Sequence, residues 1–182
     1  IIRLTIEALQ KKANELRVDV ARMIGPERTG HLGGACSLAD IVAVLYYKQM
    51  CHRPEDPKWE DRDRFLLSKG HAALIQYAAL GDLGYYPKEW QSTLKDLGSP
   101  LQGHPDMHKL PGIEANTGSL GQGLSIAAGM AAGLRLDGKE ARVYVCIGDG
   151  EMAEGQIWEA AMSASVFKLD NLCAIIDING LQ

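Results

Sequence analysis

Residues 142–182 read RVYVCIGDGEMAEGQIWEAAMSASVFKLDNLCAIIDINGLQ, and this stretch decides the fold. The apolar run at 143–147 predicts a fully buried strand, because it lacks the alternation of polar and apolar residues that marks a half-solvated strand. We expect a helix at about 155–168 and a second apolar strand at 172–176. A strand–helix–strand unit of this length is typical of an α/β fold, here predicted as an open, mostly parallel sheet flanked by helices.

Both predicted strands end in polar residues that can bind a ligand. GDG follows the first strand at 148–150, and DING follows the second at 177–180. Ligands of an open parallel sheet bind outside the carboxyl ends of its strands, so Asp149 and Asn179 are expected to face one crevice. A carboxylate and an amide oxygen suit a hard cation such as Mg2+, and a bound phosphate or diphosphate usually supplies further oxygens.

Two other interpretations of the GDG turn stay open. Gly148, Gly150 and Gly155 come close to the GxGxxG fingerprint of a dinucleotide site, although the third glycine is two positions late. Asp149 would also repel a pyrophosphate there unless a metal bridged the two charges. Alternatively, the turn only joins strand to helix, and Asp149 caps the helix. The placement of Asn179 at the matching strand end favours the metal site over this simple cap.

The composition is that of a soluble globular protein, with 46% hydrophobic and 23% charged residues in 182 positions. This length fits one domain or a large piece of a bigger one. A formal net charge of -4 gives no basic face, so nucleic acid is not an expected partner. No apolar run approaches the ~20 residues of a membrane helix, and no signal peptide is visible, so we expect a cytoplasmic protein with no membrane partner. Cys146 and Cys173 fall in the predicted strands, where a reduced thiol behaves as a small hydrophobic group.

The rest of the chain alternates between helical periodicity and glycine-rich loops. A capping-box pattern, Ser37 with Asp40 three residues later, predicts the start of one helix. The irregular segment at 98–117 is long for a compact domain, and such loops are usually functional. The expected helices are 4–24, 37–50, 72–80, 86–97 and 124–134, and a short strand is expected at 64–67.

Three histidines lie in these loops, each beside a glycine. His31 lies within TGHLGGAC at 29–36, His71 belongs to SKGHA at 68–72, and His104 belongs to GHP at 103–105. Glycines let a ligand approach the backbone closely, so these loops suit binding better than they suit a core. His108 has no such setting and is expected to lie on the surface.

The segment GSLGQG at 118–123 leads into a helix of small residues. A glycine-rich turn at a helix N-terminus exposes unpaired N–H groups and the positive end of the helix dipole, which favours anions. The glycines would also allow close helix packing, and the two roles are compatible.

Together these motifs resemble the N-terminal half of transketolase, a thiamine diphosphate enzyme, over essentially the whole chain. The GDG…N element is shared by thiamine diphosphate enzymes generally and indicates only the cofactor, whereas SKGHA, GSLGQG and KLDNL are more specific. The related deoxyxylulose phosphate synthase is expected to differ around His71. In this chain His31 is followed by Leu32, where many members have proline. The motifs that carry the resemblance are GHLGG (30–34), DRFLLSKGHA (63–72), GHP (103–105), TGSLGQG (117–123), GDGEMAEG (148–155) and DINGL (177–181).

The resemblance implies a metal and cofactor site built from these positions. Asp149 and Asn179, with the backbone carbonyl of Leu181, would hold Mg2+ against the diphosphate of thiamine diphosphate. Gly150 would donate its backbone N–H to that diphosphate. Three residues of the glycine-rich turn would lie against the cofactor: Gly118, Ser119 and Leu120.

The resemblance also implies catalytic roles. His31, His71 and His104 would surround the reactive thiazolium carbon and hydrogen-bond the hydroxyls and carbonyl oxygen of the sugar, and His71 would also touch the diphosphate. Histidines titrate near neutrality, so they can donate a proton to a developing alkoxide and then take it back. Glu154 would belong to a carboxylate network across the subunit interface.

The implied reaction is reversible transfer of a two-carbon ketol unit from a ketose phosphate to an aldose phosphate. In this family, the glutamate that activates the aminopyrimidine ring and the arginines that grip the sugar phosphate lie in a later domain. We therefore expect residues 1–182 to be a diphosphate-binding domain that is incomplete at its C-terminus. It should be inactive without a C-terminal transketolase section or domain, and part of a homodimer or heterotetramer. Two alternatives stay open: another thiamine diphosphate enzyme of the synthase or decarboxylase type, and a non-catalytic cofactor-binding section.

Overall fold

The computed structural model describes residues 4–26 and 28–178 of the 182-residue chain. Within these residues, three parallel strands form one sheet in the order β1 (Arg64–Leu67), β2 (Val143–Gly148) and β3 (Leu172–Asp177). The central strand is β2, in which Val143 lies opposite both Arg64 of β1 and Leu172 of β3. All three strands therefore end at the same edge, and the predicted open parallel sheet is confirmed.

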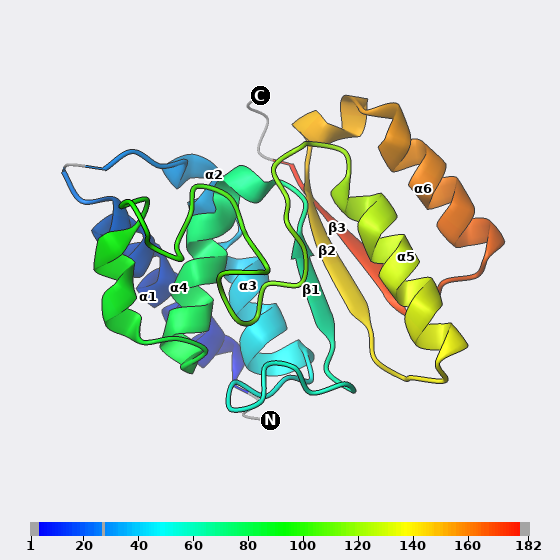
Figure 1. The fold of residues 1–182 in the computed structure, drawn as a ribbon, viewed down its shortest axis with the longest axis horizontal. Coiled ribbons are helices and arrows are strands. Elements are labelled where there is room, and N and C mark those ends of the chain that lie inside the picture. The colour runs from blue at the N-terminus through cyan, green and yellow to red at the C-terminus, as the bar shows by residue number, and fades with distance from the viewer. Residues whose placement is uncertain (1–3, 27, 179–182) are drawn as a thin grey trace.

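Helices cover both faces of this sheet (Figure 1). On one side lie α1, α3 and α4, and on the other lie α5 and α6. No helix within residues 4–26 and 28–178 has the length and apolar character needed to cross a membrane. The α-helices are α1 (Ile6–Ile24), α2 (Leu32–Ser37), α3 (Ala39–Val44), α4 (Ala73–Leu83), α5 (Gly123–Leu136) and α6 (Gly155–Val166); a π-helix follows α3 at Leu45–Gln49, and 3-10 helices occupy Gly70–Ala72, Lys88–Thr93 and Gly150–Ala153.

The helix α1 shows how the sequence builds the first layer. The Thr5 hydroxyl caps its N-terminus by accepting a hydrogen bond from the N–H of Ala8 at 3.3 Å, and Gly25, with a φ of 54°, ends it. Apolar residues recur every three or four positions along the face that packs on α3 and α4. The buried ones are Leu9, Ala13, Leu16, Val20 and Met23.

The strand β2 is buried along its whole length because it has a helical layer on each face. Its side chains alternate between two cores. Tyr144 and Cys146 join the core that contains α1, α3 and α4, whereas Val143, Val145 and Ile147 join the core that contains α5 and α6. This two-sided burial is what the unbroken apolar run at 143–147 predicted.

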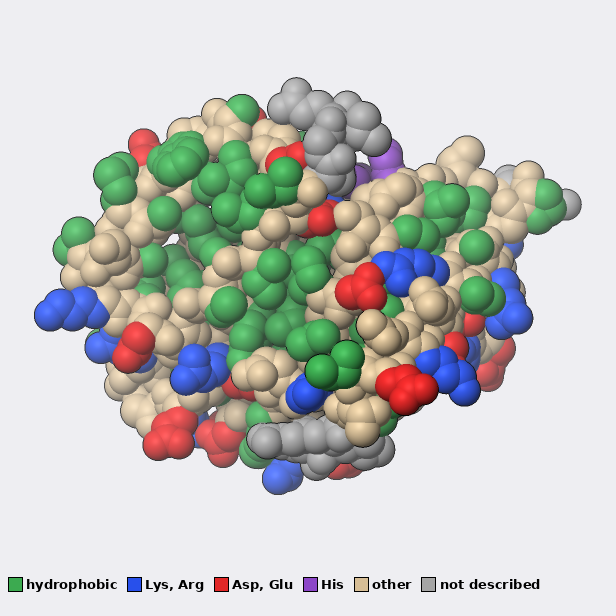
Figure 2. All heavy atoms as spheres, turned by 180° about the vertical axis from the view of Figure 1, so that it is seen from behind, with side chains coloured by type: hydrophobic (Ala, Val, Ile, Leu, Met, Phe, Trp, Pro, Cys, Tyr) green, Lys and Arg blue, Asp and Glu red, His purple; other side chains and the backbone are tan. Residues whose placement is uncertain are grey.

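The strand β3 forms where the second apolar strand was expected, but much of it is exposed. It pairs with β2 along one edge, and no other described strand pairs with its second edge. Leu172 and Ile175 are half-buried, whereas Cys173 and Ile176 are exposed, so the prediction that Cys173 packs inside an apolar strand is wrong for this structure. Figure 2, the view from behind, shows apolar side chains gathered across the middle of the molecule.

Two predicted helices differ in detail: the one expected at 37–50 begins at Ala39 and ends as a π-helix, and the one expected at 86–97 has another form. Ser37 ends α2 instead of capping a helix at 37–50, and its hydroxyl donates to Oδ1 of Asp177 at 2.8 Å. The helix expected at 86–97 is a shorter 3-10 helix, Lys88–Thr93. There the hydroxyl of Thr93 donates to the carbonyl oxygen of Trp90 at 2.8 Å, which competes with the backbone pattern of an α-helix.

Candidate functional site

The candidate site lies at the carboxyl edge of the sheet, where three loops meet. Residues 68–72 follow β1, residues 148–155 follow β2, and residues 117–123 lead into α5. Glycine is required where these loops touch. A Cβ at Gly70 would lie 2.7 Å from the backbone nitrogen of Gly118, and one at Gly123 would lie 2.4 Å from the Cβ of Ser68. The loops are therefore packed as closely as their backbones allow.

A buried carboxylate joins the three loops. Glu151, which is 1% exposed, accepts hydrogen bonds from the hydroxyl of Ser68 at 2.7 Å, the N–H of Gly121 at 2.9 Å and the N–H of Gly148 at 2.8 Å. The sequence pattern alone does not identify Glu151, because two of its donors lie 83 and 30 residues away. The one local signal is an acidic residue directly after the turn that follows a buried strand.

Asp149 lies at the end of β2 and caps the 3-10 helix that follows. Its Oδ1 accepts a hydrogen bond from the N–H of Gly150 at 3.1 Å, so it caps this short 3-10 helix and not α6, whose N-cap position is Glu154. The N–H of Asp149 donates to the carbonyl oxygen of Asp177 at 3.2 Å, which holds the ends of β2 and β3 side by side. The two other expected metal ligands, Asn179 and Leu181, lie outside the described residues.

Lys69 and Asp177 form a buried ion pair at the same edge. Lys69 is 2% exposed, and the hydroxyl of Ser37 adds a hydrogen bond to the carboxylate of Asp177. The pair links the loop after β1 to the end of β3, across β2. It therefore fixes both outer strands at the edge where the site lies.

Negative charge exceeds positive charge among the described residues of this edge. Asp149, Glu151 and Asp177 supply three carboxylates, and Lys69 supplies one ammonium group. Such a set would repel a diphosphate by itself but fits a diphosphate that brings a divalent cation. No group of three or more His, Cys, Asp or Glu side chains within the described ranges is arranged to hold a metal. A cation here would therefore also need oxygen atoms from its ligand.

The three loop histidines come together at this edge. The rings of His31 and His71 lie edge to face, with their centroids 5.1 Å apart. A Cβ at Gly118 would lie 2.9 Å from Cδ2 of His104, so the third histidine packs against the loop 117–123. His108 is exposed, as expected, and has no such setting.

The surroundings of His71 favour its neutral form. Burial lowers the pKa of His71 below its ordinary value of 6.5, and the positive charges of His31, Lys69 and His104 lower it further. The carboxylate of Glu151 opposes these effects in part. A neutral imidazole has one donor and one acceptor nitrogen, which suits hydrogen bonding to hydroxyl groups.

Three of the other predicted site residues are exposed: two in the loop 117–123 and one beside it. Glu154 lies at the start of α6, where its side chain caps no backbone group of the helix. A Cβ at Gly121 would lie 2.7 Å from the Cβ of Glu154, so the glutamate packs against the glycine-rich turn. Ser119 is exposed, and Leu120 is 41% exposed. These side chains are accessible to a ligand or to another subunit.

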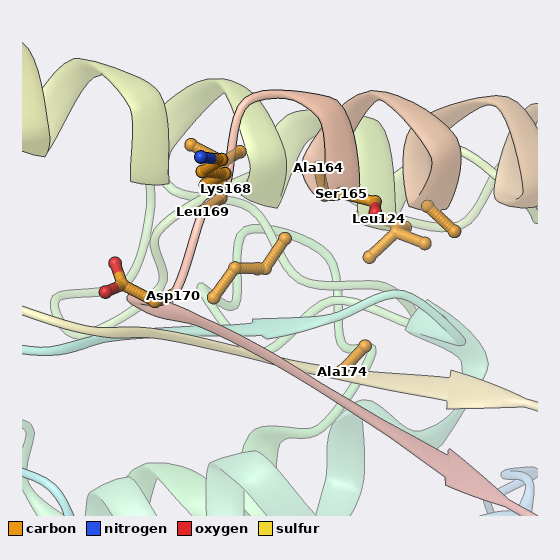
Figure 3. A pocket seen from close by; sticks show the side chains of 9 residues that line it. Leu124, Ala164, Ser165, Lys168, Leu169, Asp170 and Ala174 are labelled. Carbon is orange, nitrogen blue, oxygen red and sulfur yellow. The ribbon is translucent and has the colours of Figure 1, made fainter.

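A separate cavity of about 430 Å3 lies between α5, α6 and β3 (Figure 3). Its walls are largely aliphatic and include Leu124, Leu169 and Ala174, with Lys168 and Asp170 also lining it. None of the candidate site residues described above lines this cavity. It reflects the uncovered side of β3 and holds no group suited to the expected chemistry.

Comparison with known proteins identifies the family. The family model described as "Transketolase, thiamine diphosphate binding domain" matches residues 8–182. The chain is 46% identical over 174 residues to "6-deoxy-6-sulfo-D-fructose transketolase subunit SqwG" of Clostridium sp. (strain MSTE9), and 44% identical over 177 residues to transketolase of Homo sapiens. These matches cover 96% and 97% of this chain, but 63% and 28% of the two relatives. The chain thus spans less than two thirds of the length of either relative.

Solved structures agree with the sequence comparison. Transketolase from Campylobacter jejuni matches with a TM-score of 0.90 at 37% identity, over 98% of this chain and 29% of that one. Transketolase from Leishmania mexicana matches with a TM-score of 0.88 at 34% identity, over 99% of this chain and 28% of that one. The resemblance noted in the sequence is confirmed, and the chain belongs to the transketolase family, of which it matches the thiamine diphosphate binding domain.

Proposed function

We propose that the chain supplies the diphosphate-binding half of a transketolase active site, which transfers a two-carbon ketol unit from a ketose phosphate to an aldose phosphate. The observation that carries this proposal is the gathering of His31, His71 and His104 beside the GSLGQG and GDG turns. Membership of the transketolase family supports it. Bound thiamine diphosphate supplies the nucleophilic carbon that makes and breaks the carbon–carbon bond.

Magnesium is proposed to bind at the ends of β2 and β3. Asp149 and Asn179, with the carbonyl oxygen of Leu181, would hold the ion against the cofactor diphosphate, to which Gly150 would donate its N–H. The excess of carboxylates at this edge supports a cation, and the diphosphate would supply the oxygens that these residues do not. Three residues are proposed to lie against the cofactor: Gly118, Ser119 and Leu120.

The histidines are proposed to hold the sugar. Because its pKa is lowered, His71 is neutral at pH 7, and its two ring nitrogens offer one donor and one acceptor. With His31 and His104 alongside, the chain can hydrogen-bond several sugar hydroxyls, and a ring nitrogen can release a proton and take it back. Glu154, exposed at the start of α6, is proposed to join a carboxylate network with a second subunit.

The active enzyme is proposed to need a further section of transketolase, either as a domain or as a separate chain. Among the relatives named as subunits are SqwG and an apulose-4-phosphate transketolase subunit of Phocaeicola vulgatus, which is 42% identical to this chain. Each is matched over 63% of its length. On this proposal, residues 1–182 form an incomplete diphosphate-binding domain, which has no activity alone and works within a homodimer or heterotetramer.

The names of these relatives favour a second candidate for the substrate. One is named for 6-deoxy-6-sulfo-D-fructose and the other for apulose 4-phosphate, at identities close to the 44% shared with the human transketolase. Assays of the complete enzyme with xylulose 5-phosphate, with these two sugars and with pyruvate would separate the candidates. Turnover of pyruvate alone would indicate another thiamine diphosphate enzyme, of the decarboxylase type.

Thermal stabilisation by ligand tests the metal and diphosphate site. Mg2+ with thiamine diphosphate, at ~100 times its dissociation constant, should stabilise the protein by roughly 2.7 kcal/mol, which a melting curve resolves. NAD serves as the comparator ligand, and Asp149→Ala should lose the shift. A shift with NAD alone, or a full Mg2+-dependent shift in Asp149→Ala, would show the site to be wrongly assigned.

A further inference from the structure

We infer that Glu151 is a positioning residue, whose buried carboxylate fixes the distance between the GDG turn at 148–150 and the GSLGQG loop at 118–123. It thereby sets the affinity of the site for a metal-bound diphosphate without touching that ligand. The inference rests on the proposed function, because these two loops are the ones proposed to hold the cofactor diphosphate.

Both oxygens of the carboxylate are already in use. Oε1 accepts hydrogen bonds from the hydroxyl of Ser68 at 2.7 Å and the N–H of Gly121 at 2.9 Å, and Oε2 accepts one from the N–H of Gly148 at 2.8 Å. With 1% of its surface exposed, Glu151 presents no oxygen to a ligand. Direct contact with a cation falls instead to Asp149, which is only half-buried.

Two opposing kinds of contact act on the same loops. Glycine sets the closest approach of the GSLGQG loop to the segment that carries the GDG turn, since a Cβ at Gly121 would lie 2.7 Å from the Cβ of Glu154. The hydrogen bonds to Glu151 resist separation of those loops. A spacing that is limited in both directions is fixed, and a fixed spacing lowers the ordering cost of binding a small charged group.

Glu151 also adds negative charge to the site. Within the described residues it has no ion-pair partner, because the neighbouring Lys69 is paired with Asp177. Its charge is held by three hydrogen bonds, and a cation in the site would be attracted to it at short range. Removal of the charge should therefore weaken a metal-bound ligand as well as loosen the loops.

The substitution Glu151→Gln tests both effects in the complete protein with any partner chain present. The amide oxygen is expected to keep the two donors at Oε1, so that the NH2 group faces the N–H of Gly148. Amide hydrogen exchange at Gly148 should become at least about tenfold faster while exchange at Gly121 is unchanged. The dissociation constant for Mg2+-pyrophosphate, measured by calorimetry, should rise at least about tenfold. A merely structural role would instead speed exchange throughout the core.

Two further variants complete the experiment. Glu140→Gln makes the same change at an exposed position and should leave exchange and affinity unchanged. Ser68→Ala removes one donor to the same carboxylate, should lower the affinity less, and tests the inference if Glu151→Gln fails to fold. Equal affinities for Mg2+-pyrophosphate in the wild type and in the folded variants at 68 and 151 would overturn the inference and leave the proposed function standing. Lack of Mg2+-pyrophosphate binding by the wild type would overturn both.

Discussion

The protonation state of His71 is determined by its surroundings, which lower its pKa. Burial lowers its pKa from 6.5, and the positive charges of His31 and Lys69 lower it further. The neutral ring that results at pH 7 can donate and accept a hydrogen bond at once. An imidazolium ring could only donate.

This shift in the pKa of His71 predicts a dependence of stability on pH. Because the folded pKa lies below the unfolded value of 6.5, the unfolded state binds more protons between the two, and the free energy of unfolding rises with pH in that window. Stability should therefore fall as pH drops through about 6.5, and His71→Gln should flatten this part of the profile. Denaturant unfolding of both proteins across this range measures the slopes, and equal slopes would rule out His71 as the source.

The buried pair of Lys69 and Asp177 predicts a stability loss of a different kind. Asp177→Asn would leave a buried ammonium group without its carboxylate, at an expected cost of about 3 kcal/mol in the free energy of unfolding. Combining it with Lys69→Met should recover most of that loss, because an apolar side chain then replaces the unpaired charge. Denaturant unfolding of the single and double variants measures both steps. A double variant as unstable as the single one would show that charge is not the cause.

The sequence predicts site residues that belong to local motifs, but it does not predict those whose partners lie far away in the chain. The three histidines each stand beside a glycine, which marks them. Two of the three donors to Glu151 lie 83 and 30 residues away, so the acidic residue after the turn does not by itself indicate burial. Ser37 looked like a helix cap, but its hydroxyl bonds to Asp177, 140 residues away. The roles of Asn179 and Leu181 stay predictions.

Among the elements, α5 carries glycines of two kinds, and paired substitutions should separate them. Gly123→Ala would place a Cβ 2.4 Å from the Cβ of Ser68, so we expect a loss of about 2 kcal/mol. Gly133 has nothing within 4 Å, and Gly133→Ala should stabilise the protein by about 0.5–1 kcal/mol, since alanine favours a helix. Melting temperatures of the two variants should move in opposite directions. A shift of both in the same direction would show that local space does not decide the outcome.

The strands were predictable as elements, but their burial was predictable only in part. The apolar run of β2 predicts burial on both faces, and both faces are covered. The run that forms β3 looks the same in the sequence, yet much of the strand is exposed. An apolar run shows that a strand can pack against apolar side chains. Whether the strand is buried depends on whether helices or further strands cover it.

At the scale of the whole molecule, the reactivity of the two strand cysteines shows whether another part of the enzyme covers β3. Cys173 on β3 is exposed, whereas Cys146 on β2 is fully buried, and burial raises its pKa to about 12. In the isolated chain, a thiol reagent should modify Cys173 quickly and leave Cys146 unmodified until unfolding. If the domain is incomplete, as proposed, Cys173 should be protected in the assembled enzyme. A Cys173 that reacts equally fast in both would argue against that incompleteness.

The order in which the strands occur along the chain has a consequence for folding. A short 3-10 helix and α6 join β2 to β3, whereas a much longer segment separates β1 from β2: Asp63 and Arg142, which are hydrogen-bonded beside that pair, are 79 residues apart. Because a longer loop costs more chain entropy to close, we expect β2, α6 and β3 to assemble first and β1 to join later. The loop after β1 carries His71, and its docking completes the edge. A full-length chain that refolds from the unfolded state would therefore form its GDG turn early and acquire its histidine cluster last.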